Sequence, residues 1–153
     1  MNRVHFAYNK NDHTAAELLL WPFGWQVDTH AADEPLMTAL AGDDANPGIP
    51  TFDPDVGADL YTTNGDTNDH MYKSTKTISF TPEGTAAATG SVFVFQDNEA
   101  DVQAEFERHV QFALDLARSA PDPSHPKSHL TGFDPPNFVV DKFNVSYGNP
   151  QTV

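Results

Sequence analysis

Apolar residues gather in a few short segments that predict strands. Residues 18–25 (LLLWPFGW) form an unbroken apolar run closed by a proline and a glycine, which predicts a short buried strand that enters a turn. Residues 76–81 alternate around two large apolar side chains, which predicts a second strand with Glu83 at its C-terminal end. Residues 91–95 (SVFVF) are typical of a third strand or of a well-buried loop.

Two segments show helical spacing. In the first, Asp33 can act as N-cap, and Gly42 ends the apolar pattern. In the second, residues 97–120, Asp97 or Asn98 can act as N-cap, and apolar residues recur every three or four positions. The first apolar stripe consists of Leu36, Met37 and Leu40, and the second consists of Val102, Phe106, Val110, Leu114 and Ala117.

The remaining segments are rich in turn-forming residues. Residues 43–57 contain proline, glycine and aspartate in a pattern that predicts a long exposed loop. Residues 121–136 contain five prolines, which is typical of a linker, and 138–147 predicts a strand. We therefore expect an α/β unit over residues 1–120, followed over 121–153 by a linker and the beginning of a β module.

Charge narrows the range of partners. The 153 residues include 22 acidic and 8 basic side chains, for a net charge of −14. This charge repels phosphate backbones and anionic lipids, so we expect neither nucleic acid nor membrane as partner. The acids are 16 Asp and 6 Glu against only 5 Lys, a pattern that favours adaptation to high salt, where self-repulsion is screened.

Further observations restrict the compartment and the chemistry. No cysteine is present, which excludes disulfides and thiolate metal sites. The sequence contains no run of 18 apolar residues, so no membrane span is predicted. Residues 1–12 lack the basic region and the apolar stretch of a signal peptide. The chain is therefore expected to carry no export signal.

Two motifs and the helix that follows them point to a known family. Residues 13–24 (HTAAELLLWPFG) place a His and a Thr before an apolar run that ends in aromatic, Pro, aromatic, Gly. Residues 61–83 (YTTNGDTNDHMYKSTKTISFTPE) place a Tyr 22 positions before a Glu. In this order, together with the helix over 97–120, these segments resemble the zinc carboxypeptidases of the carboxypeptidase A type. The resemblance covers about residues 13–120.

The resemblance implies a fold and a set of site residues. The fold would be the C-terminal half of a mixed-sheet carboxypeptidase domain, with helices packed on the sheet. His13 would be one ligand of a catalytic Zn²⁺, and Glu83 would take and return the proton of the attacking water. Tyr61 would close over the peptide substrate, and the pocket for the C-terminal side chain would be lined by the segment from Asn64 to Asp69, including Asn64, Asp66 and Asn68.

The same resemblance implies what this chain lacks. In the family, a His-x-x-Glu motif supplies the first two zinc ligands, and Arg residues that bind substrate lie in the same upstream half; none of these motifs is present here. We therefore expect a fragment that is inactive alone and that works with the missing N-terminal half as partner. The full-length family member would be extracellular.

A different class of function is also compatible with the sequence. Residues 64–69 (NGDTND) offer oxygen ligands suited to calcium, which favours a non-enzymatic cation-binding or structural module. The loop lacks the Gly and Glu that an EF-hand needs at its sixth and twelfth positions, where Asp69 and Thr75 stand. His125 and His129 are a weaker candidate for a metal pair, because Pro126 prevents a regular helix between them.

Overall fold

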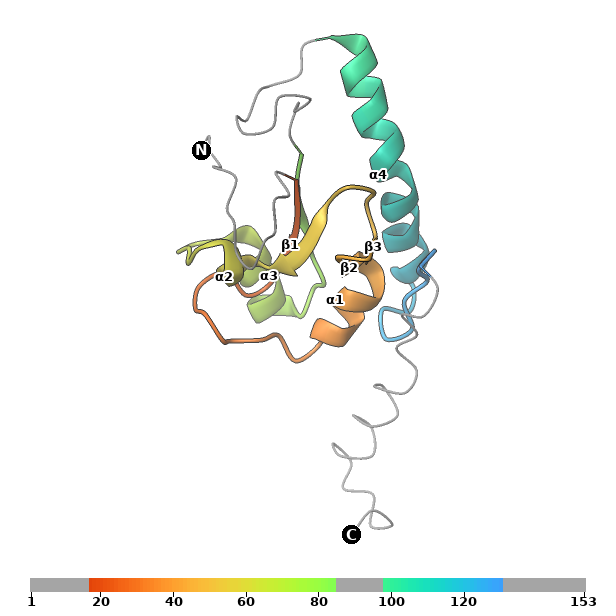
Figure 1. The fold of residues 1–153 in the computed structure, drawn as a ribbon. Helices are drawn as coiled ribbons and strands as arrows, with labels where there is room; N and C mark the ends of the chain where they lie inside the picture. Colours follow the sequence, from red (N-terminus) through yellow and green to blue (C-terminus); the bar gives the residue numbers. More distant parts are fainter. Residues whose placement is uncertain (1–16, 85–97, 131–153) are drawn as a thin grey trace.

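The computed structural model describes residues 17–84 and 98–130, which form a mixed α/β fold (Figure 1). The strands are β1 (Leu18–Trp21), β2 (Gly42–Asp43), β3 (Asn46–Pro47), β4 (Asp53–Val56) and β5 (Thr81–Glu83). The helices are α1 (Glu34–Ala41), α2 (Gly57–Leu60), α3 (Thr67–Thr75) and α4 (Glu99–Ser119). The predicted α/β class is confirmed at this level.

A three-stranded mixed sheet forms the centre of the described residues. Its order is β4-β1-β5, with β4 parallel and β5 antiparallel to β1, while β2 and β3 form a separate hairpin. Leu20 is opposite Thr81 and Leu18 is opposite Glu83, so these four side chains share one face. Leu19 and Trp21 point to the other face, because side chains alternate along a strand.

The second face of the sheet carries the hydrophobic core. Leu19 and Trp21 belong to a buried cluster with residues of α1, α3, β4 and α4. In Figure 1, α1 and α4 lie along one side of the sheet, and α2 and α3 lie toward its lower left. The buried apolar cluster consists of Leu19, Trp21, Ala31, Met37, Leu40, Ala41, Ile49, Phe52, Val56, Tyr72 and Phe112.

The prediction of an exposed loop over residues 43–57 is confirmed for the exposed residues 43–46 but is wrong for most of 48–56. Ile49 and Phe52 are 0% and 2% exposed, and β4 follows them directly. Among the described strands β4 pairs with β1 alone, so the missing N–H of Pro54 costs little there. Burial of the large apolar side chains outweighs the turn-forming composition that suggested a loop.

Two predicted elements differ in detail. The strand predicted over 76–81 is displaced to Thr81–Glu83, although Glu83 does stand at a strand's C-terminal end. Helix α1 confirms the helix predicted between Asp33 and Gly42, but the Asp33 side chain does not cap it. The Asp33 carboxylate instead accepts a hydrogen bond from the Tyr72 hydroxyl at 2.9 Å, and that hydroxyl accepts one from the Asp33 backbone N–H at 3.0 Å.

Helix α4 confirms the longest predicted helix, and Asn98 caps it by accepting a hydrogen bond from the Asp101 backbone N–H. The residues that α4 buries are, however, not those of the predicted apolar stripe. Val102, Phe106 and Leu114 are 51%, 61% and 43% exposed, whereas Phe112, Asp115 and Ser119 are buried. Among the described residues, no helix combines the length and the apolar character required to cross a membrane.

Residues 121–130, which were predicted to be a linker, fold back on α4. The buried Asp115 carboxylate accepts hydrogen bonds from the His129 backbone N–H at 2.7 Å and from its ring at 2.5 Å. Ser119 accepts one from the Lys127 backbone N–H. The predicted domain boundary near 120 stays a prediction, because 131–153, like the predicted strand over 91–95, lies outside the described residues.

We expect Asp115→Ala to lower the free energy of unfolding by about 3 kcal/mol, because it leaves buried donors without an acceptor. Urea denaturation followed by circular dichroism measures this change. The control is Glu107→Ala on the exposed side of α4, which should stay within about 0.5 kcal/mol of the parent. Equal effects of the two substitutions would contradict the anchoring role of Asp115.

Candidate functional site

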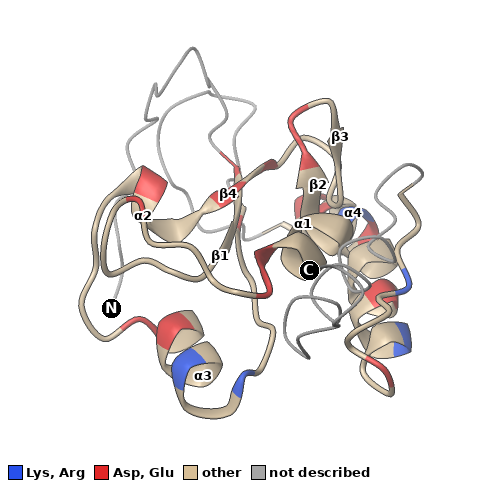
Figure 2. Ribbon diagram, turned by 90° about the horizontal axis from the view of Figure 1, so that it is seen from below, with Lys and Arg blue, Asp and Glu red and all other residues tan. Residues whose placement is uncertain are grey.

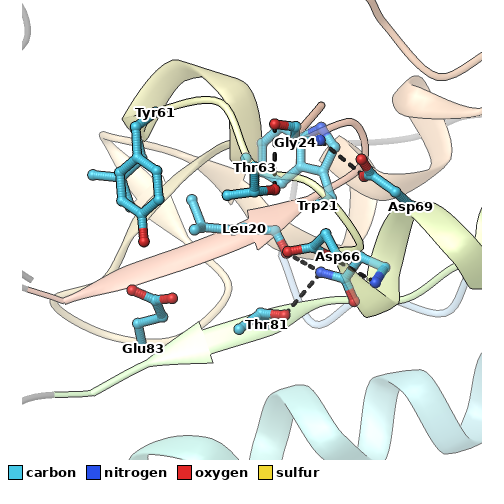
Figure 3. A pocket seen from close by; sticks show the side chains of 12 residues that line it. Leu20, Trp21, Gly24, Tyr61, Thr63, Asp66, Asp69, Thr81 and Glu83 are labelled. Carbon is cyan, nitrogen blue, oxygen red and sulfur yellow. Dashed lines mark hydrogen bonds between the residues drawn. The ribbon is translucent and has the colours of Figure 1, made fainter. Parts of the chain in front are cut away.

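A pocket lies against the first face of the sheet and extends around the C-terminal end of β1, where Trp21 of the core cluster also borders it (Figure 3). It is a shallow hollow: its space of about 350 Å³ includes open solvent, and the enclosed part is about 20 Å³, which is room for about one water molecule. Its walls come from β1 and the following turn, from α2 and the residues after it, from the start of α3, and from β5. The lining residues are Leu20, Trp21, Gly24, Gly57, Leu60, Tyr61, Thr63, Asp66, Asn68, Asp69, Thr81 and Glu83.

The pocket brings together four of the predicted site residues from separate segments. Glu83 is the last residue of β5 and is half-buried, opposite Leu18 in β1. Tyr61 follows α2 directly and is 41% exposed. In Figure 3 the Tyr61 hydroxyl points toward the side of the pocket where the Glu83 carboxylate lies. The Glu83 carboxylate and the Tyr61 phenol therefore lie at the same end of the pocket.

Asp66 and Asn68 line the pocket from the beginning of α3. Asp66 is the N-cap of this helix, and its carboxylate accepts a hydrogen bond from the Asn68 backbone N–H at 2.8 Å. The Asn68 side chain, in a residue only 7% exposed, donates to the Thr81 hydroxyl at 2.8 Å and to the Leu20 carbonyl at 3.4 Å. Asn64 is exposed and does not line this pocket, and its predicted contact with substrate stays a prediction.

Asp69 and Gly24 are pocket residues to which the sequence assigned no separate role. Asp69 Oδ1 accepts a hydrogen bond from the Gly24 backbone N–H at 2.8 Å. Burial raises the pKa of the Asp69 carboxyl and the charge of Asp66 raises it further, while the backbone N–H groups of Gly24 and Trp25 and the charge of Lys73 act against this rise. A side chain at position 24 would bring its Cβ within 2.8 Å of the Thr63 hydroxyl, so the close approach requires glycine.

Two polar atoms in the wall stand out within the described part of the chain. Trp21 Nε1 and Asp69 Oδ2 are both buried, and neither has a hydrogen-bond partner among the described residues. Buried polar groups are normally paired with protein or with water. The enclosed part of the pocket has room for about one water molecule, and an ordered water there would pair such a group.

His13 lies outside the described residues, so its predicted role as a zinc ligand stays a prediction. β1 begins at Leu18, which is opposite Glu83 in the sheet. Just before β1, Glu17 forms a two-pronged ion pair with Arg108 of α4, with N–O distances of 2.7 and 2.8 Å. This pair fixes the start of β1 against α4, and the carboxylate raises the pKa of the Arg108 guanidinium.

Residues 17–84 and 98–130 show no group of three or more His, Asp or Glu side chains placed to hold a metal ion. The segment considered for calcium is the turn and first part of α3, and its Asp66 and Asp69 carboxylates accept backbone hydrogen bonds. His125 and His129 bind different carboxylates, Asp122 and Asp115, and do not act as a pair.

Comparisons of the chain with models of protein families, with curated proteins and with solved structures found no match.

Because the pKa of Asp69 is raised, we expect the difference in stability between the parent chain and Asp69→Asn to depend on pH. The folded chain holds this proton to higher pH than the unfolded chain, so the contribution of Asp69 to stability is complete below its ordinary pKa of 3.8 and is lost as the pH rises through the folded value. Asp69→Asn keeps an acceptor for Gly24 without the charge. We therefore expect the variant to gain stability over the parent at pH 7 but much less at pH 3.

Urea denaturation at the two pH values measures this difference. Because any lost carboxylate relieves repulsion in a chain of net charge −14, Glu107→Gln on the exposed side of α4 serves as the matched control. The gain at pH 7 should be larger for Asp69→Asn than for Glu107→Gln. A smaller gain, or none, would show that the buried Asp69 charge costs the fold nothing.

Proposed function

We propose that the chain carries one half of the active site of a zinc-dependent metallocarboxypeptidase. The observation that supports this most is the pocket itself, where Tyr61 and Glu83, 22 residues apart in sequence, lie at one end. Their separation along the chain is one part of the resemblance, beside the motif over residues 13–24 and the helix over 97–120. Their convergence on a common pocket is a separate, geometric observation that an unrelated fold would not require.

Glu83 is suited to the role of general base. It lies on the last residue of a strand that is hydrogen-bonded to β1, so its backbone is held by the sheet. Its side chain is half-buried beside Leu18 and Leu20, which reduces competition from bulk water. In the proposed reaction Glu83 takes a proton from the attacking water and passes it to the leaving amine.

Tyr61 is suited to the role of a capping side chain. It is placed after the short helix α2, which is tied to the turn after β1 by a hydrogen bond from the Ala58 backbone N–H to the Phe23 carbonyl at 2.9 Å. Its exposed ring can cover a bound peptide and exclude water, while its hydroxyl donates a hydrogen bond to the substrate.

The described residues do not provide a set of zinc ligands. In this proposal the ligands are therefore His13 and residues of an upstream segment. Zinc, when bound, supplies a Lewis acid and lowers the pKa of its water. The chain alone is then inactive and requires the missing N-terminal half as partner. The proposed whole enzyme is halophilic and acts on peptides outside the cell.

The test is a carboxypeptidase assay of residues 1–153 joined to the polypeptide encoded directly upstream, in concentrated NaCl with Zn²⁺. We expect release of C-terminal amino acids that a chelator abolishes. Glu83→Gln should lower kcat by at least about 100-fold, because it removes the proton acceptor. Tyr61→Phe should lower kcat/KM by about tenfold, since it removes one hydrogen bond.

The control variant is Glu107→Gln, which removes a carboxylate from the exposed side of α4 and should keep the parent activity. Full activity of Glu83→Gln would contradict the proposed role of the carboxylate. If the joined polypeptide takes up no zinc and releases no amino acid, the peptidase proposal is wrong as a whole.

A further inference from the structure

We propose that Asn64 is a site of spontaneous covalent modification, at which its side-chain amide is converted to a carboxyl group in the folded chain. Asn64 is the only asparagine of the sequence that is followed by glycine. Asn64 and Gly65 lie in a bend between α2 and α3, and both are exposed. The inference goes beyond the proposed peptidase function and depends neither on zinc nor on turnover.

The modification requires only the chain and water. The backbone nitrogen of Gly65 attacks the side-chain carbonyl carbon of Asn64, so that a C–N bond forms and the amide group leaves as ammonia with the proton of that nitrogen. Water then opens the succinimide ring. Attack of water on the side-chain carbonyl gives aspartate, and attack on the backbone carbonyl gives isoaspartate. This chemistry is one reason why asparagine is a thermolabile residue.

The attacking nitrogen of Gly65 is accessible. Its N–H donates no hydrogen bond within residues 17–84 and 98–130. A Cβ placed on Gly65 would have no heavy atom within 4 Å apart from its chain neighbours, and the φ angle of 74° is one that glycine adopts at little cost. Neither packing nor hydrogen bonding therefore prevents the peptide from rotating into the geometry of attack.

Asn68 provides a contrast within the same segment. It is only 7% exposed, and its side-chain amide donates to the Leu20 carbonyl and to the Thr81 hydroxyl. It also belongs to α3, so ring closure would break these hydrogen bonds and distort the first turn of the helix. The structure therefore favours reaction at Asn64 and opposes it at Asn68.

The modification would alter one wall of the pocket. Thr63 and Asp66 flank the reactive pair and both line the pocket (Figure 3). The Thr63 backbone N–H donates to the Gly24 carbonyl at 2.7 Å, and Asp66 is the N-cap of α3. Isoaspartate adds one carbon atom to the backbone between these two fixed points. It also adds a negative charge close to Asp66.

The experiment incubates residues 1–153, folded in concentrated NaCl, at pH 7 and at pH 9. Chymotrypsin, which cleaves after Tyr61 and Tyr72, then releases residues 62–72 with both Asn64 and Asn68. Mass spectrometry measures the conversion of amide to acid, and fragmentation assigns it to one residue. A methyltransferase specific for isoaspartate identifies that product. The same incubation in guanidinium chloride gives the rates in the unfolded chain, and a sample digested without incubation corrects for reaction during digestion.

We expect Asn64 to react in the folded chain at a rate within about threefold of that in the unfolded chain, because folding adds no obstacle. The rate should be higher at pH 9, since the deprotonated nitrogen of Gly65 is the nucleophile. Folding should slow Asn68 at least about tenfold, because its hydrogen bonds must break. Isoaspartate should be found at position 64.

Two variants serve as controls. Asn64→Gln lengthens the side chain, so the five-membered ring cannot form and residues 62–72 should keep their mass. Gly65→Ala should slow the reaction at least about tenfold, because its Cβ hinders the approach of the backbone nitrogen. Circular dichroism confirms that each variant is folded.

Three results would overturn the inference. The first is a rate at Asn64 that folding lowers by more than about threefold, which would show that the structure protects it. The second is conversion at Asn68 in place of Asn64. The third is an equal gain of mass in residues 62–72 of Asn64→Gln.

Discussion

The buried amide of Asn68 joins the three elements on which the pocket depends. From the second residue of α3 it donates to the Leu20 carbonyl in β1 and to the Thr81 hydroxyl in β5. Asn68 is only 7% exposed, and burying its amide without these hydrogen bonds would cost free energy of folding. They therefore fix α3 against the sheet, and with it Asp66 and Asp69, which stand two residues before and one residue after Asn68.

The two faces of the sheet have different roles: one packs in the core and the other lines the pocket. Leu19 and Trp21 point into the core formed with α1, α3 and α4, whereas Leu18 and Leu20 share the opposite face with Glu83 and Thr81. Because alternate residues of one strand serve each face, a shift in register by one residue would move the core side chains into the pocket. The same pairing that stabilises the fold therefore also places Glu83.

The sequence predicted those elements whose signals are local. Leu36, Met37 and Leu40 with Gly42 predicted α1, and the run over 18–25 predicted β1 and its turn. Both signals arise from the pattern within one segment. Helix α3 was not predicted, although Asp66 is a typical N-cap, because the polar residues that follow it offer no apolar stripe.

What the sequence could not predict depends on contacts between distant segments. Residues 43–57 have the composition of a loop, and only their packing against β1 makes β4 a strand. The opposite holds for Val102 and Phe106, whose helical spacing predicted a packed face but which are exposed. The spacing of apolar residues along a helix does not show which of its faces has a neighbour. Within the site, the role of Gly24 beside Thr63 and Asp69 has no signal in a single sequence, because the three come from separate segments.

The distribution of charge connects the site to the acidic character of the chain. Figure 2 shows acidic residues on α2, α3, β4 and the β2–β3 hairpin, while Lys and Arg occur on α3, just after it, and on and beyond α4. A general acidic surface is well solvated in concentrated salt and needs no partner charge. Asp69 differs from that surface, because its second oxygen is buried and its pKa is raised by burial. High salt screens repulsion among exposed carboxylates, but it acts less on the desolvation of the partly buried Asp69, which the backbone hydrogen bond from Gly24 offsets instead.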